Sequence, residues 1–235
     1  MPTKPHPSQN QLLAALPAAD LERWLPRLER VELELGQVLA EPGQDYEHMY
    51  FPTTAIVALL SVAGEGHAAG VAVAGCDGLV GMPVLTGGGS TTQRAVVQVA
   101  GQAYRIGADF VRQALQDSPS AMAVLLRYTV ARMAQVCQAA VCNRHHAVDQ
   151  QFCRWLLLNL DRMDSNTLQT TQYRIAELLG VRREGVTGAA VKLQQAGVIR
   201  YTRGRITVVD RRGLEARSCE CYAVVKKEFE RLIPA

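Results

Sequence analysis

The stretch from residue 170 to residue 209 constrains the fold of this chain most, because it predicts two short helices joined by a tight turn. Thr170 or Thr171 is placed to cap the first helix, and Gly180 to end it in a left-handed conformation. The second helix carries an apolar stripe at positions i, i+4 and i+7, formed by Val186, Ala190 and Leu193. Two helices this close together are typical of a helix-turn-helix.

A hairpin is predicted directly after the second helix. Two β-rich runs, 198–201 and 206–209, flank the turn at 202–205. Gly204 suits such a turn, and Arg203 and Arg205 lie at its tip. The whole stretch therefore predicts a winged helix-turn-helix, a module that places its second helix in the major groove of DNA.

The distribution of charge supports a nucleic-acid partner. Residues 170–235 hold 13 Lys and Arg against 7 Asp and Glu, a net charge of +6, whereas residues 1–169 hold 12 against 15, a net charge of −3. A compact basic module gains affinity for duplex DNA by releasing the counterions condensed on the phosphates. An ordinary solvated face would explain the charge alone, but not the charge together with the helix pair and the hairpin.

The N-terminal part predicts a different architecture. Apolar spacing from residue 10 to residue 30 indicates one or two short helices broken near Pro17, and alternating residues then begin at Val31. Further β-like runs follow at 48–51, 55–61, 68–74, 94–99 and 102–106, with glycines between them. Because no helix is predicted among these runs, we expect an antiparallel barrel or roll of about eight strands.

A long helix is predicted after Gly107, over some 35 residues. Six of its residues are spaced by 4, 3, 4, 3 and 4, which is an a/d heptad seam: Met122, Leu126, Thr129, Met133, Val136 and Ala140. Phe110, Leu125 and Val130 lie off this seam. We expect one side of the helix to pack on its own barrel and the seam to pack on a second copy of the chain; burial of both sides within one chain is the alternative.

Composition indicates a cytoplasmic protein without a membrane partner. The first eleven residues are polar and proline-rich, unlike a signal peptide, and no apolar run approaches the roughly 18 residues that a membrane span needs. In a reducing compartment the six cysteines do not imply disulfides.

In its order of parts the chain resembles the Crp/Fnr family of transcription regulators. The specific matches are TTQYRIAELLGVRREGVTGAAVKLQQAGVI with the wing RGRITVVD, and LGQVLAEPG at residues 35–43. The resemblance implies an α+β fold with three parts: N-terminal helices and a β-roll sensor over 1–108, a dimerisation helix and hinge over 109–145, and a winged helix-turn-helix over 146–235. It also implies a homodimer on a pseudo-palindromic operator, with RNA polymerase as a further partner.

The resemblance assigns roles in DNA reading. The recognition helix over 183–196 starts with Arg183 and Glu184, which match the family's base-reading pair. Arg donates two hydrogen bonds to guanine, and Glu accepts one from cytosine. Phosphate contacts alone for Arg183, and a helix-dipole role for Glu184, are the alternatives. Five residues are expected to contact phosphates: Thr171, Gln172, Arg182, Arg203 and Arg205.

Departures from the family pattern narrow these roles. Gly188 stands where many relatives carry a second base-reading arginine, and Arg182 stands where a serine often caps the recognition helix. The operator sequence of a relative therefore does not transfer to this chain.

The expected effector pocket also departs from the family. In cyclic-nucleotide-binding relatives a Gly-Glu pair and an Arg-Ser pair hold the ribose and phosphate. Here the matching places hold Gly81, Met82, Arg94 and Ala95, and Thr129 is added from the long helix. Since Met82 and Ala95 lack the polar atoms, cyclic AMP is disfavoured and the effector is left open.

Metal and haem cofactors are open alternatives. Soft metal ligands occur near the end of the long helix (Cys137, Cys142, His145, His146, Cys153) and near the C-terminus (Cys219, Cys221). No Cys-x-x-Cys pair occurs, so no metal site is predicted and most thiols are interpreted as small core residues. Haem is left open with His48, His67, His145 and His146 as ligands, and no spacing selects one.

Two rival functions compete with a non-enzymatic regulator. A cupin-like metal enzyme needs several ligands converging inside the barrel, where only His48 and His67 lie. A sensor module acting through protein contacts would lack duplex binding.

Overall fold

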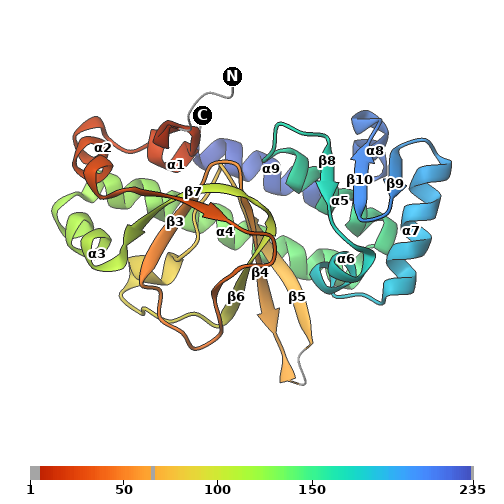
Figure 1. Ribbon diagram of the computed structural model, residues 1–235, viewed down its shortest axis with the longest axis horizontal. Coiled ribbons are helices and arrows are strands. Elements are labelled where there is room, and N and C mark those ends of the chain that lie inside the picture. Colours follow the sequence, from red (N-terminus) through yellow and green to blue (C-terminus); the bar gives the residue numbers. More distant parts are fainter. Residues whose placement is uncertain (1–5, 65–66, 234–235) are drawn as a thin grey trace.

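The computed structural model describes residues 6–64 and 67–233, so residues 1–5, 65–66 and 234–235 lie outside the description. Figure 1 shows a β-rich half and a smaller helical half side by side, with a long helix running behind the strands toward the helical half. The expected α+β class is confirmed.

Two short helices precede the strands, α1 (Gln11–Ala14) and α2 (Ala18–Trp24), as the break near Pro17 predicted. Asn10 caps α1, since its Oδ1 accepts hydrogen bonds from the backbone N–H groups of Leu12 (3.1 Å) and Leu13 (3.2 Å). Trp24 at the end of α2 is fully buried against the ring of Phe51, edge to face at 6.2 Å. Single-turn 3-10 helices flank the pair at Pro7–Gln9 and Leu25–Arg27.

Two antiparallel sheets form the β-rich half. One has the order β1-β7-β3, and the other has the order β2-β6-β4-β5. The strands are β1 (Glu29–Leu33), β2 (Val38–Ala40), β3 (His48–Pro52), β4 (Ile56–Val62), β5 (Ala68–Ala74), β6 (Gln93–Val99) and β7 (Gly101–Gly107). The predicted runs match β3 to β7 closely, whereas the short β2 was not among them.

The strand count of this half is close to the expected number, and one expectation was wrong in detail. The described part of the roll has seven strands, supplemented by isolated bridges at Asp45 with Ser90 and Tyr50 with Val80. A 3-10 helix at Met82–Thr86 interrupts the strands, where none was expected. Pro83 in its first turn and Gly81 before it, at φ 105°, explain this local departure from extended backbone.

The long helix predicted after Gly107 is two helices, α3 (Ala108–Asp117) and α4 (Pro119–His145). Pro119 has no N–H to donate and keeps the preceding Ser118 out of the helical region, at φ −130° and ψ 89°. The Ser118 hydroxyl then caps α4 by accepting from the backbone N–H of Ala121 at 3.2 Å. Helix α4 continues to His145, so the expected interruption at 143–146 begins only at His146.

The helical half begins with α5 (Val148–Leu160) and β8 (Thr167–Gln169). The helix pair α6 (Gln172–Leu179) and α7 (Arg183–Gln195) follows, and then the hairpin β9 (Ile199–Thr202) and β10 (Arg205–Val208). Strand β8, which was not predicted, adds a third strand to the hairpin, in the order β8-β10-β9. Two further helices, α8 (Arg211–Arg217) and α9 (Cys221–Leu232), were not predicted.

Helix α9 turns back from the helical half and packs along α4 (Figure 1). The rings of Tyr128 and Phe229 meet edge to face at 6.2 Å between these helices. One continuous hydrophobic core therefore extends from α1 through the sheets to α9.

Candidate nucleic-acid interface and sensor pocket

The helix pair α6–α7 is built as its sequence predicted. Thr171 caps α6, with its hydroxyl accepting from the backbone N–H of Arg174 at 3.3 Å, and Gly180 ends α6 at φ 65°. The predicted stripe of α7 is buried at exposures of 0–4%: Val186, Ala190 and Leu193. The opposite side of α7 is consequently free for a partner.

The base-reading pair lies at the exposed start of α7. Arg183 and Glu184 are its first two residues, and neither side chain has a hydrogen-bond or ion-pair partner in the described part of the chain. Gly188, on the next turn of the helix, has no atom within 4 Å of the position its Cβ would occupy. The exposed surface of α7 thus offers a guanidinium and a carboxylate at one end and a bare backbone beyond them.

The five expected phosphate contacts divide into two groups. Arg182, Arg203 and Arg205 are exposed and have no ion-pair partner among residues 6–64 and 67–233, and Gly204 forms the wing turn at φ 70°. Thr171 and Gln172 already have structural tasks: Thr171 caps α6, and the Gln172 side chain accepts the Thr187 hydroxyl at 2.8 Å, joining α6 to α7.

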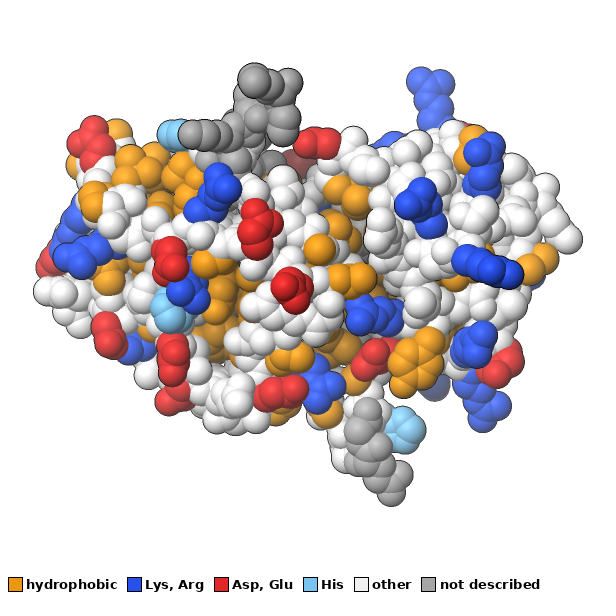
Figure 2. All heavy atoms as spheres, viewed as in Figure 1, with side chains coloured by type: hydrophobic (Ala, Val, Ile, Leu, Met, Phe, Trp, Pro, Cys, Tyr) orange, Lys and Arg blue, Asp and Glu red, His pale blue; other side chains and the backbone are white. Residues whose placement is uncertain are grey.

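Figure 2 shows how charge is distributed over one face of the molecule. Lys and Arg side chains gather on the helical half, and Asp and Glu side chains gather on the β-rich half. This agrees with the opposite net charges of the two parts of the sequence. The face that carries α7 and the wing is therefore the electrostatically favourable face for a polyanion.

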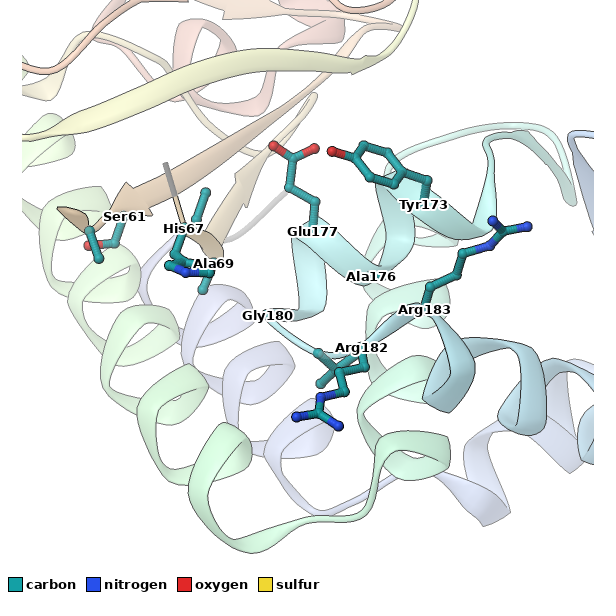
Figure 3. Close-up of a pocket in the computed structure, with 12 residues that line it drawn as sticks. Ser61, His67, Ala69, Tyr173, Ala176, Glu177, Gly180, Arg182 and Arg183 are labelled. Carbon is teal, nitrogen blue, oxygen red and sulfur yellow. The ribbon is translucent and has the colours of Figure 1, made fainter. Parts of the chain in front are cut away.

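A cleft of about 670 Å³ separates the helix pair from the tip of the β4–β5 hairpin. Figure 3 shows Ser61, His67 and Ala69 on one wall, and residues of α6 with Arg182 and Arg183 on the other. Beside the cleft the backbones come very close, because a Cβ at Gly70 would lie 2.5 Å from the carbonyl oxygen of Leu178. The β4–β5 hairpin thus contacts α6 directly.

Buried polar contacts also join the two halves. Gln98 of β6 donates to Asn159 of α5 at 2.6 Å. Arg162, just after α5, pairs with Asp77 of the β-rich half, with distances of 2.9 Å from Nε to Oδ1 and 2.5 Å from Nη2 to Oδ2. The side chains of Arg162 and Asp77 are only 4% and 16% exposed.

A second cavity, of about 510 Å³, lies between the β-roll and α4. Three of the five predicted effector residues line it, Gly81, Met82 and Thr129. Arg94 and Ala95 do not: Arg94 pairs with Glu41 at 2.8 Å, and Ala95 is fully buried in β6. The pairing of β6 with β2 turns Arg94 toward Glu41, so the structure does not bring these two residues to the cavity.

Arg132 is the residue of this cavity that sequence reasoning missed. Its side chain is 3% exposed, and its Nε and Nη1 atoms have no hydrogen-bond partner within the described residues. Its Nη2 lies beside the Tyr128 hydroxyl and 3.5 Å from the Leu79 carbonyl. Burial lowers the pKa of Arg132 to about 9, which still leaves it charged at neutral pH. An arginine four residues after Tyr128 on the buried side of α4 was the available signal.

Part of the predicted heptad seam lies on the side of α4 that its own chain leaves exposed, whereas Met122 and Val136 pack partly against the core. Leu126 and Met133 are 49% and 60% exposed, and Val130 and Val141 beside them are 49% and 45% exposed. Leu125, off the seam, is fully buried against the roll. Thr129, Met133 and Val136 belong both to the seam and to the lining of the 510 Å³ cavity.

The histidines and cysteines are arranged in a way that the sequence did not reveal. Cys142, His146, Cys219 and Cys221 come together at the end of α4. Cys137, Cys153, His145 and the two roll histidines, His48 and His67, do not belong to this group. The cupin-like alternative therefore gains no support from His48 and His67.

Comparisons with known proteins agree with this geometry. Residues 150–217 match the model of the Crp-like helix-turn-helix domain. In the part of the chain that is described, no helix combines the length and apolar character needed to cross a membrane. No curated protein matches the chain significantly.

Solved structures similar to the chain are regulators. One assigned to the Crp/Fnr family of Eubacterium rectale has a TM-score of 0.69 and 17% identity, covering 89% of this chain and 98% of its own. FixK2 of Bradyrhizobium japonicum has a TM-score of 0.68 and 15% identity, covering 82% and 98%. The regulator CLP of Xanthomonas campestris, described as responsive to c-di-GMP, has a TM-score of 0.65 and 16% identity, covering 82% and 99%.

The two kinds of comparison concern different parts of the chain. The domain match concerns the helix pair and wing, and the structural likeness extends over the β-roll and the long helix. Together they show a Crp-like helix-turn-helix domain at residues 150–217, in a chain that has the fold of Crp/Fnr regulators.

Proposed function

We propose that this protein is a homodimer that binds a pseudo-palindromic operator, with α7 of each copy in successive major grooves. The observation that carries this proposal is the pair Arg183 and Glu184, exposed and unpartnered within the described chain at the start of α7. A free guanidinium and a free carboxylate at that place match the donor and acceptor pattern of a G·C pair.

The remaining contacts would position the protein on the DNA and would not select the base sequence. Arg182, Arg203 and Arg205 are exposed cations on either side of α7 and would contact phosphates, which fix register without reading sequence. Thr171 and Gln172 would add hydroxyl and amide hydrogen bonds next to their structural roles. We place the protein in the cytoplasm, with RNA polymerase as a second partner once the operator is bound.

The dimer would form through α4. Its uncovered seam exposes Leu126 and Met133 by about half or more, and a second copy of the same helix buries such a stripe in the coiled-coil manner. The domain limits that follow are 1–108 for the sensor, 109–145 for the dimerisation part and 146–235 for the DNA module.

The 510 Å³ cavity would hold the effector, and Arg132 favours an anionic one. A buried guanidinium with two unpartnered nitrogens within the described chain gains most from a carboxylate or phosphate. Because Thr129, Met133 and Val136 line both cavity and seam, such a ligand would bear on the dimer contact. A ligand changes this equilibrium only by its differential affinity for the two arrangements.

Selection from a randomised duplex library, followed by fluorescence anisotropy at several salt concentrations, tests the proposal. We expect two inverted half-sites centred about one helical turn apart, roughly 10 base pairs. Affinity should fall steeply with salt, as several phosphates are contacted per dimer. Failure to bind any library member at low salt, with or without added anions, would contradict the proposal.

A further inference from the structure

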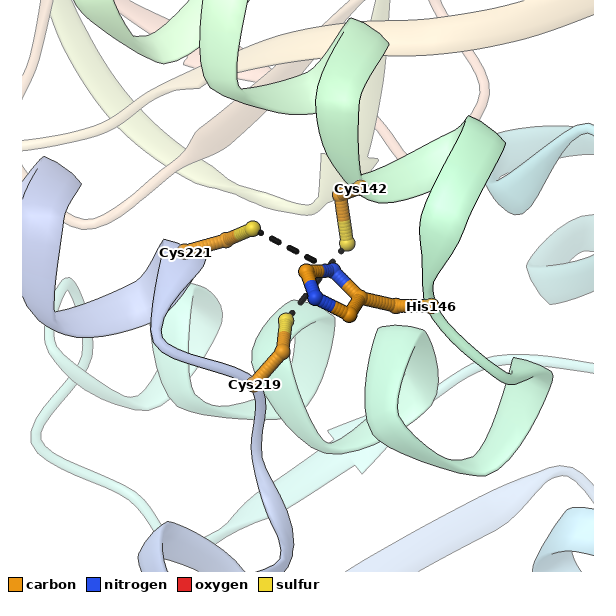
Figure 4. A group of neighbouring side chains, drawn as sticks. All are labelled: Cys142, His146, Cys219 and Cys221. Atoms are coloured by element: carbon orange, nitrogen blue, oxygen red, sulfur yellow. Dashed lines mark hydrogen bonds between the residues drawn. The ribbon is translucent and has the colours of Figure 1, made fainter.

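Four metal-ligand side chains from separate parts of the chain meet at the end of α4. Cys142 and His146 come from its last turn and the residue that follows it. Cys219 comes from the connection between α8 and α9, and Cys221 is the first residue of α9. Figure 4 shows the three sulfur atoms and the imidazole ring facing one another. The three cysteines are at most 4% exposed, and the His146 side chain is 14% exposed. We call this set the Cys3His cluster.

The spacing within the cluster fits a single tetrahedral ion. With Zn–S bonds of about 2.3 Å and a Zn–N bond of about 2.0 Å, a tetrahedron separates two sulfurs by about 3.8 Å and a sulfur from a nitrogen by about 3.5 Å. Here Sγ of Cys142 lies 3.5 Å from Sγ of Cys219, and Sγ of Cys221 lies 3.4 Å from Nδ1 of His146. All four ligand atoms lie within 4.8 Å of one another.

Neighbouring polar groups orient the ligands as in metal sites. With Nδ1 of His146 facing the sulfurs, its Nε2 lies 3.3 Å from the Glu220 carboxylate. A carboxylate on the far nitrogen of a ligating histidine fixes its tautomer and increases its basicity. The Gln138 amide donates to Sγ of Cys221 at 3.2 Å, and such a hydrogen bond helps to hold the sulfur in place.

Core packing, a disulfide and an iron-sulfur cluster each account for less of this arrangement. Thiols that merely pack as core residues need neither a histidine aimed at them nor a carboxylate behind it. A disulfide between Cys142 and Cys219 would use two of the four groups. An iron-sulfur cluster spreads its ligands over several irons bridged by sulfide and needs them farther apart than one ion does.

We propose a closed tetrahedral Cys3His site for a structural zinc ion, with these four side chains as ligands. Cys142 and His146 are four residues apart, about one helical turn, which presents both on one side of the end of α4. Cys219 and Cys221 flank Glu220, so the same short segment supplies two ligands and the carboxylate that orients His146. The ion would fasten the start of α9 to the end of α4, where the dimerisation part meets the DNA module.

Metal content of the untagged, full-length chain, purified under reducing conditions without added metal, tests this proposal. We expect elemental mass spectrometry to find one zinc ion per chain. Cys219→Ser and Cys221→Ser should each hold less than about a tenth of that amount. Cys153→Ser is the matched control, because Cys153 is equally buried and lies outside the cluster; it should keep its zinc.

Two further measurements apply even if the ligand variants unfold. Glu220→Gln leaves every ligand in place, and we expect it to weaken zinc affinity about 10–100-fold in chelator competition. Replacement of zinc by Co²⁺ in the wild-type chain should give the intense visible bands of a tetrahedral thiolate site. Any of four results would overturn the proposal. The wild-type chain could lack zinc even after refolding in the presence of zinc, or it could hold iron and sulfide instead. The reduced preparation could contain a Cys142–Cys219 disulfide, or Cys153→Ser could lose as much zinc as the ligand variants.

Discussion

Removal of the Asp77 carboxylate should destabilise the protein far more than removal of an exposed carboxylate. In Asp77→Ala the Arg162 guanidinium keeps its charge but loses both of its contacts with Asp77, at 2.9 and 2.5 Å. It remains in a site where its side chain is 4% exposed, between the Leu158 carbonyl and the Phe229 ring, whose centroid is 5.6 Å away. The guanidinium therefore stays largely buried, with the Leu158 carbonyl as its remaining hydrogen-bond acceptor among the described residues.

The structure sets the magnitude of this effect. Breaking a buried ion pair from one side costs about 3–5 kcal/mol, because an uncompensated charge stays buried. For a chain of this size each kcal/mol lowers Tm by roughly 2–4 °C, so the expected loss is about 6–20 °C. The matched control is Asp117→Ala, whose pair with Arg23 at 2.9 Å is 59% and 41% exposed and is worth at most about 1 kcal/mol.

Both variants are compared with wild type by thermal unfolding at one protein concentration, since dimerisation makes Tm depend on concentration. Asp77→Asn keeps the shape of the side chain and an acceptor for Nε, so its loss should fall between wild type and Asp77→Ala. If Asp77→Ala and Asp117→Ala change Tm equally, burial of the Arg162 pair does not stabilise the contact between the two halves, and the reasoning fails.

Three sets of substitutions test the proposed function. Arg183→Ala should relax base preference by about 1–3 kcal/mol at one position of each half-site, whereas Arg205→Ala should weaken all sequences alike; identical selected motifs for wild type and Arg183→Ala would exclude base reading. Leu126→Glu combined with Met133→Glu should give a monomer in sedimentation, and an unchanged dimer would exclude the α4 seam. Small carboxylates and phosphates at about 100 Kd should stabilise wild type by about 2.7 kcal/mol but not Arg132→Met; an equal rise of Tm in that variant would refute the anion site.

Local patterns in the sequence predicted the local structure well. The β-like runs became β3 to β7, and the capped helix pair became α6 and α7. In the helix pair, burial of one side imposes the helical period on the residues themselves. The division of the long helix was also visible in principle, since Pro119 follows a serine that caps α4. Its apolar periodicity nevertheless continues across the break, and this favoured one helix.

Contacts between distant segments could not be predicted in the same way. The Cys3His cluster joins two parts of the chain more than 70 positions apart, and neither part contains a spacing that indicates metal by itself. The position of Arg94 outside the 510 Å³ cavity was hidden for a related reason: which side of β6 a residue occupies depends on pairing with β2, and Glu41 is brought near only by that pairing. Arg132 becomes a candidate anion ligand only because distant segments of the roll bury it at the cavity.

The contact between Gly70 and Leu178 has a mechanical consequence. With no side chain between the hairpin and α6, backbone already rests on backbone, and closer approach would meet hard repulsion. The contact therefore limits motion in one direction. The helix pair α6–α7 cannot move closer to the β4–β5 hairpin and is able only to move away from it. Regulation in this chain would then depend on whether the helix pair rests against the β4–β5 hairpin or has moved away from it. In Gly70→Ala the added methyl group would keep the two apart without any ligand.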